Sequence, residues 1–245
     1  MDQQLMTPVS VKEKVLVALD VASTTEALKL ADTLRGSVGG FKIGGRLFTA
    51  EGPSIVRALA ERGDRVFLDL KFHDIPSTVG AAVAAATDLG VWMVNVHASG
   101  GTEMLRAARE AALEAAAKRG SQPPLVIAVT VLTSMNQASL RETGIVIDLL
   151  DQVLRLAELT KEAGLDGVVA SPRETRAIRA RCGTGFTIVT PGIRGGAASA
   201  PKDDQERTMA PAEALASGAS YLVVGRPIIA AADPVSAARS IAGGE

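Results

Sequence analysis

The sequence predicts an α/β protein that folds as a single-domain (β/α)8 barrel, a TIM barrel, because eight short apolar runs alternate with helical patterns along 245 residues. The runs are rich in Val, Ile and Leu and are apolar throughout, as expected for parallel strands that are covered on both faces. Hydrophobic residues make up 47% of the chain, enough to bury a sizeable core. An open, doubly wound sheet is the alternative, but no Gly-x-Gly-x-x-Gly loop follows the first run.

The apolar runs and the capping residues between them give the order of the elements. The expected strands cover residues 15–20, 40–43, 66–71, 93–97, 125–131, 167–170, 187–190 and 221–224. Ser23 is a suitable cap for the first helix, Pro76 fits the first turn of the second, and Gly120 stops the third. The expected helices cover residues 27–34, 77–89, 102–118, 148–163, 172–181, 211–217 and 234–241.

The chain is predicted to hold one catalytic barrel domain, residues 15–245, after a polar lead-in of residues 1–14. Two connections are long, one of residues 133–147 and one of residues 195–209. Long connections in a compact domain are often lids or binding loops, so both are candidates for contact with a ligand.

Composition excludes several classes of function. The net charge of -1 and the 3% aromatic content provide neither the basic field nor the stacking surfaces of a nucleic-acid binder. No apolar stretch reaches the length of about 20 residues that crosses a membrane, and the first residues lack the pattern of a signal peptide. The single cysteine, Cys182, cannot form an internal disulfide, which fits a reducing compartment. We therefore expect a cytoplasmic protein with neither a nucleic-acid nor a membrane partner.

Charged residues gather where the first three expected strands end. Asp20 ends the first strand, Lys42 lies in the second, and Asp69 and Lys71 end the third, with Asp74 just beyond it. Alternate strand residues share a face, and a TIM barrel carries its active site at this end of its strands. Buried charges are costly unless they pair or do chemistry. The pattern favours a lysine held protonated by acids and able to donate its proton. The alternative is an ion-pair network that only closes the barrel.

The last two expected strands end in glycine and arginine. Residues 190–196 read Thr-Pro-Gly-Ile-Arg-Gly-Gly, and residues 223–227 read Val-Val-Gly-Arg-Pro. Glycine lets backbone N–H groups approach a ligand and arginine binds anions, and these two loops form the usual phosphate site of the fold. We therefore expect phosphate at Arg194, Gly225 and Arg226. Turn glycines beside surface arginines are the alternative. Residues 195–209, which include Gln205, could close over the phosphate.

The two histidines and the single cysteine are weaker candidates for a functional role. His73 and His97 lie near the charged cluster, and packing or support of the site is expected of them. Cys182 has Arg179 and Arg181 as neighbours, which could lower its pKa, but an incidental thiol at a helix end is the favoured interpretation. No group of residues has the spacing of metal ligands, so no metal is expected.

Residues 69–78, Asp-Leu-Lys-Phe-His-Asp-Ile-Pro-Ser-Thr, resemble the signature of the orotidine 5′-phosphate decarboxylase family. The similarity covers nearly the whole chain from Val15. It extends through Leu19-Asp20, Phe41-Lys42-Ile43-Gly44, Asn95-Val96-His97-Ala98, Val131-Leu132-Thr133-Ser134, Pro191-Gly192-Ile193-Arg194 and Val224-Gly225-Arg226-Pro227. Related sugar-phosphate barrels share the Asp-x-Lys-x-x-Asp core, whereas the Ile-Pro-x-Thr extension and the paired phosphate motifs are specific. Ser77 stands where the family more often has Asn, and Gly195-Gly196 replaces a more usual Pro-Ala.

The resemblance implies a reaction and a role for each matched residue. Orotidine 5′-phosphate would lose CO2 from C6 to give uridine 5′-phosphate (UMP), through a C6 carbanion and without metal or cofactor. Lys71 would protonate C6 and Asp69 would lie beside the departing carboxylate. Lys42 would hold the network and contact the ribose together with Asp20, and Thr133 would contact the pyrimidine. Phosphate would be bound by Arg194, Gln205, Gly225 and Arg226.

The resemblance also implies a homodimer with shared active sites, in which Asp74, Ile75 and Thr78 reach the site of the neighbouring subunit. Three other functions stay open at this point. A related sugar-phosphate enzyme would use the same acid–lysine core with magnesium. Lys71 could instead form a Schiff base with a substrate. A non-catalytic sensor of a phosphorylated ligand is the third, although a sensor has no need of an ammonium between two acids.

Overall fold

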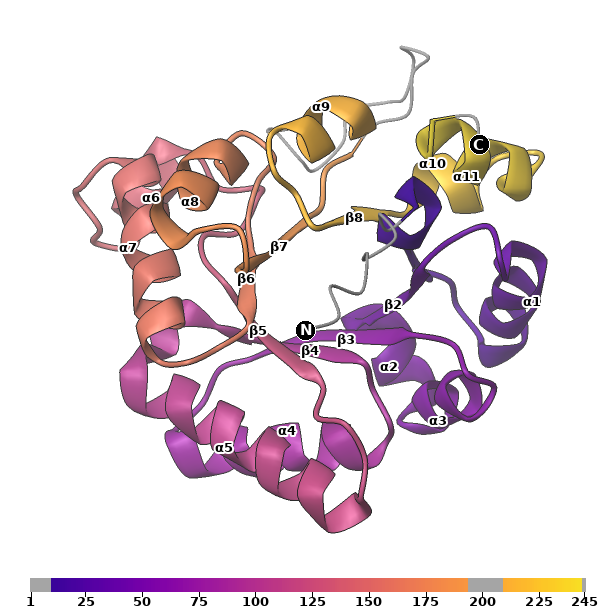
Figure 1. The fold of residues 1–245 in the computed structure, drawn as a ribbon, viewed down its shortest axis with the longest axis horizontal. Coiled ribbons are helices and arrows are strands. Elements are labelled where there is room, and N and C mark those ends of the chain that lie inside the picture. Colours follow the sequence, from indigo (N-terminus) through magenta and orange to yellow (C-terminus); the bar gives the residue numbers. More distant parts are fainter. Residues whose placement is uncertain (1–9, 194–208, 244–245) are drawn as a thin grey trace, which may run out of the picture.

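The computed structural model describes residues 10–193 and 209–243, and its eight parallel strands pair in sequence order to close a barrel. In Figure 1 the strands surround the centre and the helices lie around them. This arrangement confirms the predicted (β/α)8 barrel. The strands are β1 Val15–Ala18, β2 Gly40–Gly44, β3 Val66–Phe72, β4 Met93–His97, β5 Leu125–Val129, β6 Gly167–Val169, β7 Thr187–Thr190 and β8 Tyr221–Val224.

The seven expected helices are present, with ends shifted by a few residues. They are α1 Thr24–Leu34, α4 Pro76–Asp88, α5 Gly101–Arg119, α7 Leu149–Glu162, α8 Thr175–Cys182, α9 Pro211–Ala216 and α11 Pro234–Ile241. Their signals act as expected: the Ser23 hydroxyl accepts from the N–H of Glu26, Pro76 opens α4, and Gly120 ends α5 in a left-handed conformation.

The structure adds four short helices that the sequence analysis did not expect. These are α2 Gly45–Glu51, α3 Ser54–Glu61, α6 Gln137–Glu142 and α10 Arg226–Ile229, besides 3-10 turns at Val11–Lys14 and Ala98–Gly100. Helix α6 lies inside the long connection 133–147, where the side chain of Asn136 caps it and Ser139 completes a capping box. That connection is therefore partly helical and not a simple loop.

Only the last residue of the second long connection, residues 195–209, falls within the described part of the chain. Ile193 and Met209, on either side of residues 194–208, form an isolated parallel bridge, and the N–H of Met209 donates to the carbonyl of Gly192 at 3.3 Å. Apart from Met209, the lid expected over residues 195–209, which includes Gln205, lies outside the described residues, and so does Arg194.

The hydrophobic core has two layers, one inside the barrel and one between the strands and the helices. The side chain of each strand residue points into one layer or the other. Side chains inside the barrel include those of Leu16, Ala18, Phe67, Met93, Ile127, Val129, Val169, Val189 and Val223. Residues between them in sequence, such as Val94 and Val96, pack outward against the helices. Because side chains alternate along a strand, Asp20, Lys42, Asp69 and Asn95 continue the inner layer at the carboxyl-terminal mouth. Within the described residues, no helix is both long and apolar enough to span a membrane.

Candidate active site

A chain of alternating charges crosses the mouth of the barrel from β1 to β3. Lys42 Nζ lies 3.2 Å from Asp20 Oδ1 and 3.5 Å from Asp69 Oδ2, and Lys71 Nζ lies 2.7 Å from Asp69 Oδ1. The structure therefore brings four of the five predicted charged residues together. Asp69 lies between two ammonium groups and links them.

The exposure of the side chains differs along this chain of charges. The side chains of Lys42 and Asp69 are 9% and 14% exposed, whereas those of Lys71 and Asp20 are 36% and 49% exposed. Burial by itself raises the pKa of the Asp69 carboxyl. The charges of Lys42 and Lys71, with hydrogen bonds from Lys71 and Asn95, outweigh burial and hold that pKa below its usual range. Asp69 is therefore ionised at neutral pH and can hold both lysines.

Lys71 reaches Asp69 from an irregular backbone. Its φ is 53°, a left-handed value that among the described non-glycine residues occurs only here. Strand β3 pairs Leu68 with Val94 and Phe72 with Val96, so three residues of β3 lie opposite one residue of β4. Their spacing in the sequence predicts that Asp69 and Lys71 share one face of a regular strand. Their proximity is confirmed, but a bulge produces it. Such strain often marks functional sites.

The residue opposite the bulge is Asn95, to which the sequence analysis gave no role of its own. Its side chain is fully buried. Its Nδ2 donates to Asp69 Oδ1 at 2.7 Å, and its Oδ1 accepts from the backbone N–H of Lys71 at 2.8 Å. A signal was available, because Asn95 is a polar residue at an inward position of the apolar strand β4.

Two histidine rings pack together beside the cluster. The centroids of His73 and His97 are 5.3 Å apart, with the rings tilted by 37°. Burial lowers the pKa of His97, the charges of His73 and Lys71 lower it further, and only Asp69 raises it. His97 is therefore neutral at neutral pH. The expected packing role of both histidines agrees with this contact.

A cavity of about 250 Å³ adjoins the charged chain. Its floor is formed by inner-layer side chains that include Phe67, Val129, Val169 and Val223. Lys42, Asp69 and Lys71 line one part of it, and Leu132, Thr133 and Pro191 line another. The cavity thus combines an apolar floor with two cations and an acid, and it contains the predicted contact residue Thr133.

The eighth strand brings the described part of the predicted phosphate site to the same mouth. Gly225 follows β8, and a Cβ at this glycine would lie 3.8 Å from Asp20 Oδ2. Arg226 is the first residue of α10 and is exposed. Gly225 and Arg226 therefore stand next to the Asp20 end of the charged chain, on the side away from Lys71.

Asp74, Ile75 and Thr78 do not join this cluster within one subunit. All three are exposed, and 64% of Ile75 is accessible to solvent. The Asp74 carboxylate accepts from the N–H of Ile75 at 2.7 Å. Ile75 precedes α4, so these residues lie where the chain leaves β3.

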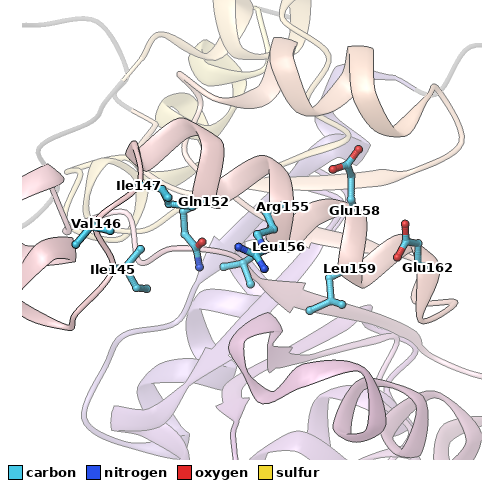
Figure 2. Close-up of a pocket in the computed structure, with 9 residues that line it drawn as sticks. All are labelled: Ile145, Val146, Ile147, Gln152, Arg155, Leu156, Glu158, Leu159 and Glu162. Carbon is cyan, nitrogen blue, oxygen red and sulfur yellow. The ribbon is translucent and has the colours of Figure 1, made fainter.

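A larger open hollow of about 620 Å³ lies away from the strand ends, along α7. Figure 2 shows the side chains of Gln152, Arg155, Leu156, Glu158, Leu159 and Glu162 along that helix, with Ile145, Val146 and Ile147 on the segment before it. None of the sequence-predicted site residues lines it. Within residues 10–193 and 209–243, no three His, Cys, Asp or Glu side chains gather as ligands for a metal ion. Cys182 is buried, and burial raises the pKa of its thiol despite Lys161 and the two arginines.

Known proteins resemble the chain over nearly its whole length. The model of the "Orotidine 5'-phosphate decarboxylase / HUMPS family" matches residues 13–241. The orotidine 5′-phosphate decarboxylase of Moorella thermoacetica is 56% identical over 240 residues, 98% of this chain and 94% of that protein. The one of Tolumonas auensis is 52% identical over 228 residues, 93% of this chain and 96% of that protein. A crystal structure of orotidine 5′-phosphate decarboxylase from Lactobacillus acidophilus matches with a TM-score of 0.83 and 36% identity, covering 94% of this chain and 97% of that one.

Proposed function

The chain belongs to the orotidine 5′-phosphate decarboxylase / HUMPS family, and from this premise we propose that it converts orotidine 5′-phosphate into UMP and CO2 in pyrimidine biosynthesis. The observation that carries the proposal is the Asp20–Lys42–Asp69–Lys71 chain of charges beside the cavity. The partly exposed ammonium of Lys71, next to an ionised acid, suits a reaction in which negative charge develops on carbon.

Lys71 supplies the proton in this mechanism. As the bond between C6 and the carboxyl carbon breaks, CO2 leaves and the electron pair stays on C6. The Lys71 ammonium stabilises that charge, then transfers a proton to C6 to give UMP and a neutral amine, which regains a proton from water. Asp69, at 2.7 Å, keeps the ammonium in place. The charge of Asp69 also repels the substrate carboxylate, and this repulsion is relieved as CO2 departs.

The other residues hold the substrate. Lys42 and Asp20 contact the ribose, and Lys42 also keeps Asp69 in position through its 3.5 Å ion pair. The pyrimidine lies in the cavity over the apolar floor, with Thr133 on one side. The phosphate is bound by Gly225 and Arg226 together with Arg194 and Gln205. Because the phosphate lies far from C6, its binding energy can close the site and serve the transition state.

The working enzyme in this proposal is a homodimer that shares its active sites. Asp74, Ile75 and Thr78 are exposed where the chain leaves β3, and they complete the site of the neighbouring subunit. This use explains why a large apolar side chain, Ile75, stands 64% exposed on the isolated chain. A cytoplasmic location fits a chain whose single cysteine, Cys182, is buried and cannot form an internal disulfide.

The test is an absorbance assay of orotidine 5′-phosphate consumption in the presence of EDTA. Turnover that forms UMP supports the proposal, and a folded preparation without turnover rejects it. Loss of activity on adding EDTA favours a magnesium-dependent sugar-phosphate enzyme. Trapping of a substrate adduct on Lys71 by borohydride favours Schiff-base chemistry over direct protonation.

A further inference from the structure

We infer that Asn95 is a positioning residue that holds Lys71 and Asp69 in their reactive arrangement, an inference that rests on the proposed function. The amide joins the two residues from one side. Its nitrogen donates to the Asp69 carboxylate at 2.7 Å, and its oxygen accepts the backbone N–H of Lys71 at 2.8 Å. It thereby links the proton donor and its acidic partner through a contact separate from their own 2.7 Å ion pair.

The backbone of β3 explains why such a link is needed. Lys71 adopts a φ of 53° inside a bulge, where three residues of β3 face one residue of β4. The residue facing the bulge is Asn95 itself, so the ladder bonds lost there are replaced by a side chain. A left-handed lysine is costly and persists only where its surroundings hold it. The amide of Asn95 supplies that restraint at the residue whose side chain carries the proton.

Only a neutral group with both a donor and an acceptor fits this position. Asn95 is fully buried, and reversing the amide would set its NH2 against the Lys71 N–H and its oxygen against the carboxylate. Leucine has the same branching as asparagine but is larger, and it leaves the Lys71 N–H unbonded and withdraws a hydrogen bond from Asp69. Aspartate keeps the acceptor for Lys71 but places a second carboxylate against Asp69, and two such carboxylates share one proton.

Two substitutions at Asn95 test whether this residue positions Lys71 and Asp69 for catalysis or only supports the fold. In Asn95→Leu, we expect kcat to fall by about 100-fold or more, as for misplacement of a reacting group. The affinity for UMP should stay within about threefold, because Asn95 bonds to Lys71 and Asp69 and not to Gly225 or Arg226, where the phosphate is proposed to bind. In Asn95→Asp at low pH, the new carboxylate and Asp69 share one proton. The protonated pair then offers the same donor and acceptor as the Asn95 amide. The kcat of this variant should approach the wild-type value in acid and fall steeply as the pair loses its proton. Thr160→Val is the matched control, since Thr160 is buried and its hydroxyl donates to the carbonyl of Leu156 within α7.

A crystal structure of Asn95→Leu provides a readout that does not depend on turnover. We expect Lys71 to leave its left-handed conformation and its Nζ to move away from Asp69. The inference is overturned if Lys71 keeps that geometry, if kcat of folded Asn95→Leu equals the wild-type value, or if the pH profile of Asn95→Asp parallels that of the wild type. Should Asn95→Leu fail to fold, the pH profile of the near-isosteric Asn95→Asp decides. The turnover of the wild-type protein in the same assay separates two kinds of failure. If the wild type converts orotidine 5′-phosphate, a negative result with the variants contradicts only the role of Asn95. If the wild type does not, the proposed function fails, and the inference about Asn95 fails with it.

Discussion

The ammonium of Lys71 and the carboxylate of Asp69 lie 2.7 Å apart although the backbone at Lys71 departs from a strand, with a φ of 53°. A regular strand would send both side chains into the barrel side by side. The bulge instead leaves the Lys71 side chain more exposed than that of Asp69, 36% against 14%. The Lys71 ammonium thus lines the cavity from a partly exposed position, while most of the Asp69 side chain is buried.

Lys71→Ala should lose most of kcat. Removal of a proton donor costs about 10²- to 10⁴-fold, and the stabilising charge next to C6 is lost as well. Initial rates of orotidine 5′-phosphate consumption measure the effect, and binding of UMP, which needs no proton transfer, serves as the control. A wild-type kcat in a folded variant would refute the role of Lys71 as proton donor.

Gly44→Ala should disturb Lys42 without unfolding the barrel. A Cβ at Gly44 would lie 2.7 Å from Lys42 Nζ and 3.5 Å from Asp20 Oδ1, so the flexible end of the lysine must move. A displacement of this size in a catalytic network can lower kcat/KM by up to roughly 100-fold, whereas the melting temperature should change little. Gly45→Ala is the matched control, because among the described residues its Cβ meets no neighbouring atom within 4 Å. Equal activity of the two variants would show that the position of Lys42 is not critical.

The positions of the eight strands were predictable because buried parallel strands are apolar along their whole length, although β1 ends at Ala18 and β5 at Val129, each two residues before the expected end. The approach of Asp69 to Lys71 followed from their spacing. The left-handed Lys71 did not, because nothing local to the sequence marks a bulge, which depends on how β3 pairs with β4. Asn95 carried a signal that was overlooked, namely an amide at an inward position of a strand. Helix α3 was missed in the same way, although Ile55, Val56 and Leu59 form a buried face of it.

Lowering the pH should destabilise the fold through His97. Burial and the neighbouring charges of His73 and Lys71 lower the pKa of this imidazole in the folded protein, and Asp69 only partly opposes them. The unfolded chain therefore binds a proton first. Stability should fall as pH drops through about 6.5, the ordinary histidine pKa, toward the lower folded value, by at most about 1.4 kcal/mol per pH unit.

Denaturant midpoints between pH 8 and pH 5 measure this loss, compared with His97→Phe, which keeps a ring against His73 but cannot bind a proton. The difference in stability between wild type and variant should shift in favour of the variant as pH falls. A difference that stays constant across the range would show that His97 does not carry the effect.

Arg226→Ala should weaken catalysis through the phosphate alone. A hydrogen bond between charged groups contributes about 1.5–3 kcal/mol, so kcat/KM for orotidine 5′-phosphate should fall about 10- to 150-fold. The nucleoside orotidine lacks the phosphate, and its slow turnover should be unchanged. Arg57→Ala, an exposed arginine on α3, controls for loss of surface charge. An equal loss with orotidine would place Arg226 elsewhere in the site.

Complementation between two inactive variants tests whether the sites are shared. Within one subunit, the exposed Asp74 accepts from the N–H of Ile75 and lies outside the Lys71–Asp69–Lys42 chain. If Asp74 instead serves the partner's site, a mixed dimer of Lys71→Ala and Asp74→Ala contains one site with both residues intact and one with neither. Random exchange makes half of the dimers mixed, so activity should return to about one quarter of the wild-type value.

The two variants are purified separately, mixed under conditions that exchange subunits, and assayed before and after mixing. Each parent alone should remain nearly inactive, because a symmetric dimer of either variant has the same defect in both sites. Mixing Lys71→Ala with Asp69→Ala is the matched control. Lys71 and Asp69 belong to one site of one subunit, so no mixed dimer restores the pair and activity should not return. Recovery in this control, or none in the Asp74 mixture despite proven exchange, would mean that Asp74 does not complete the partner's site.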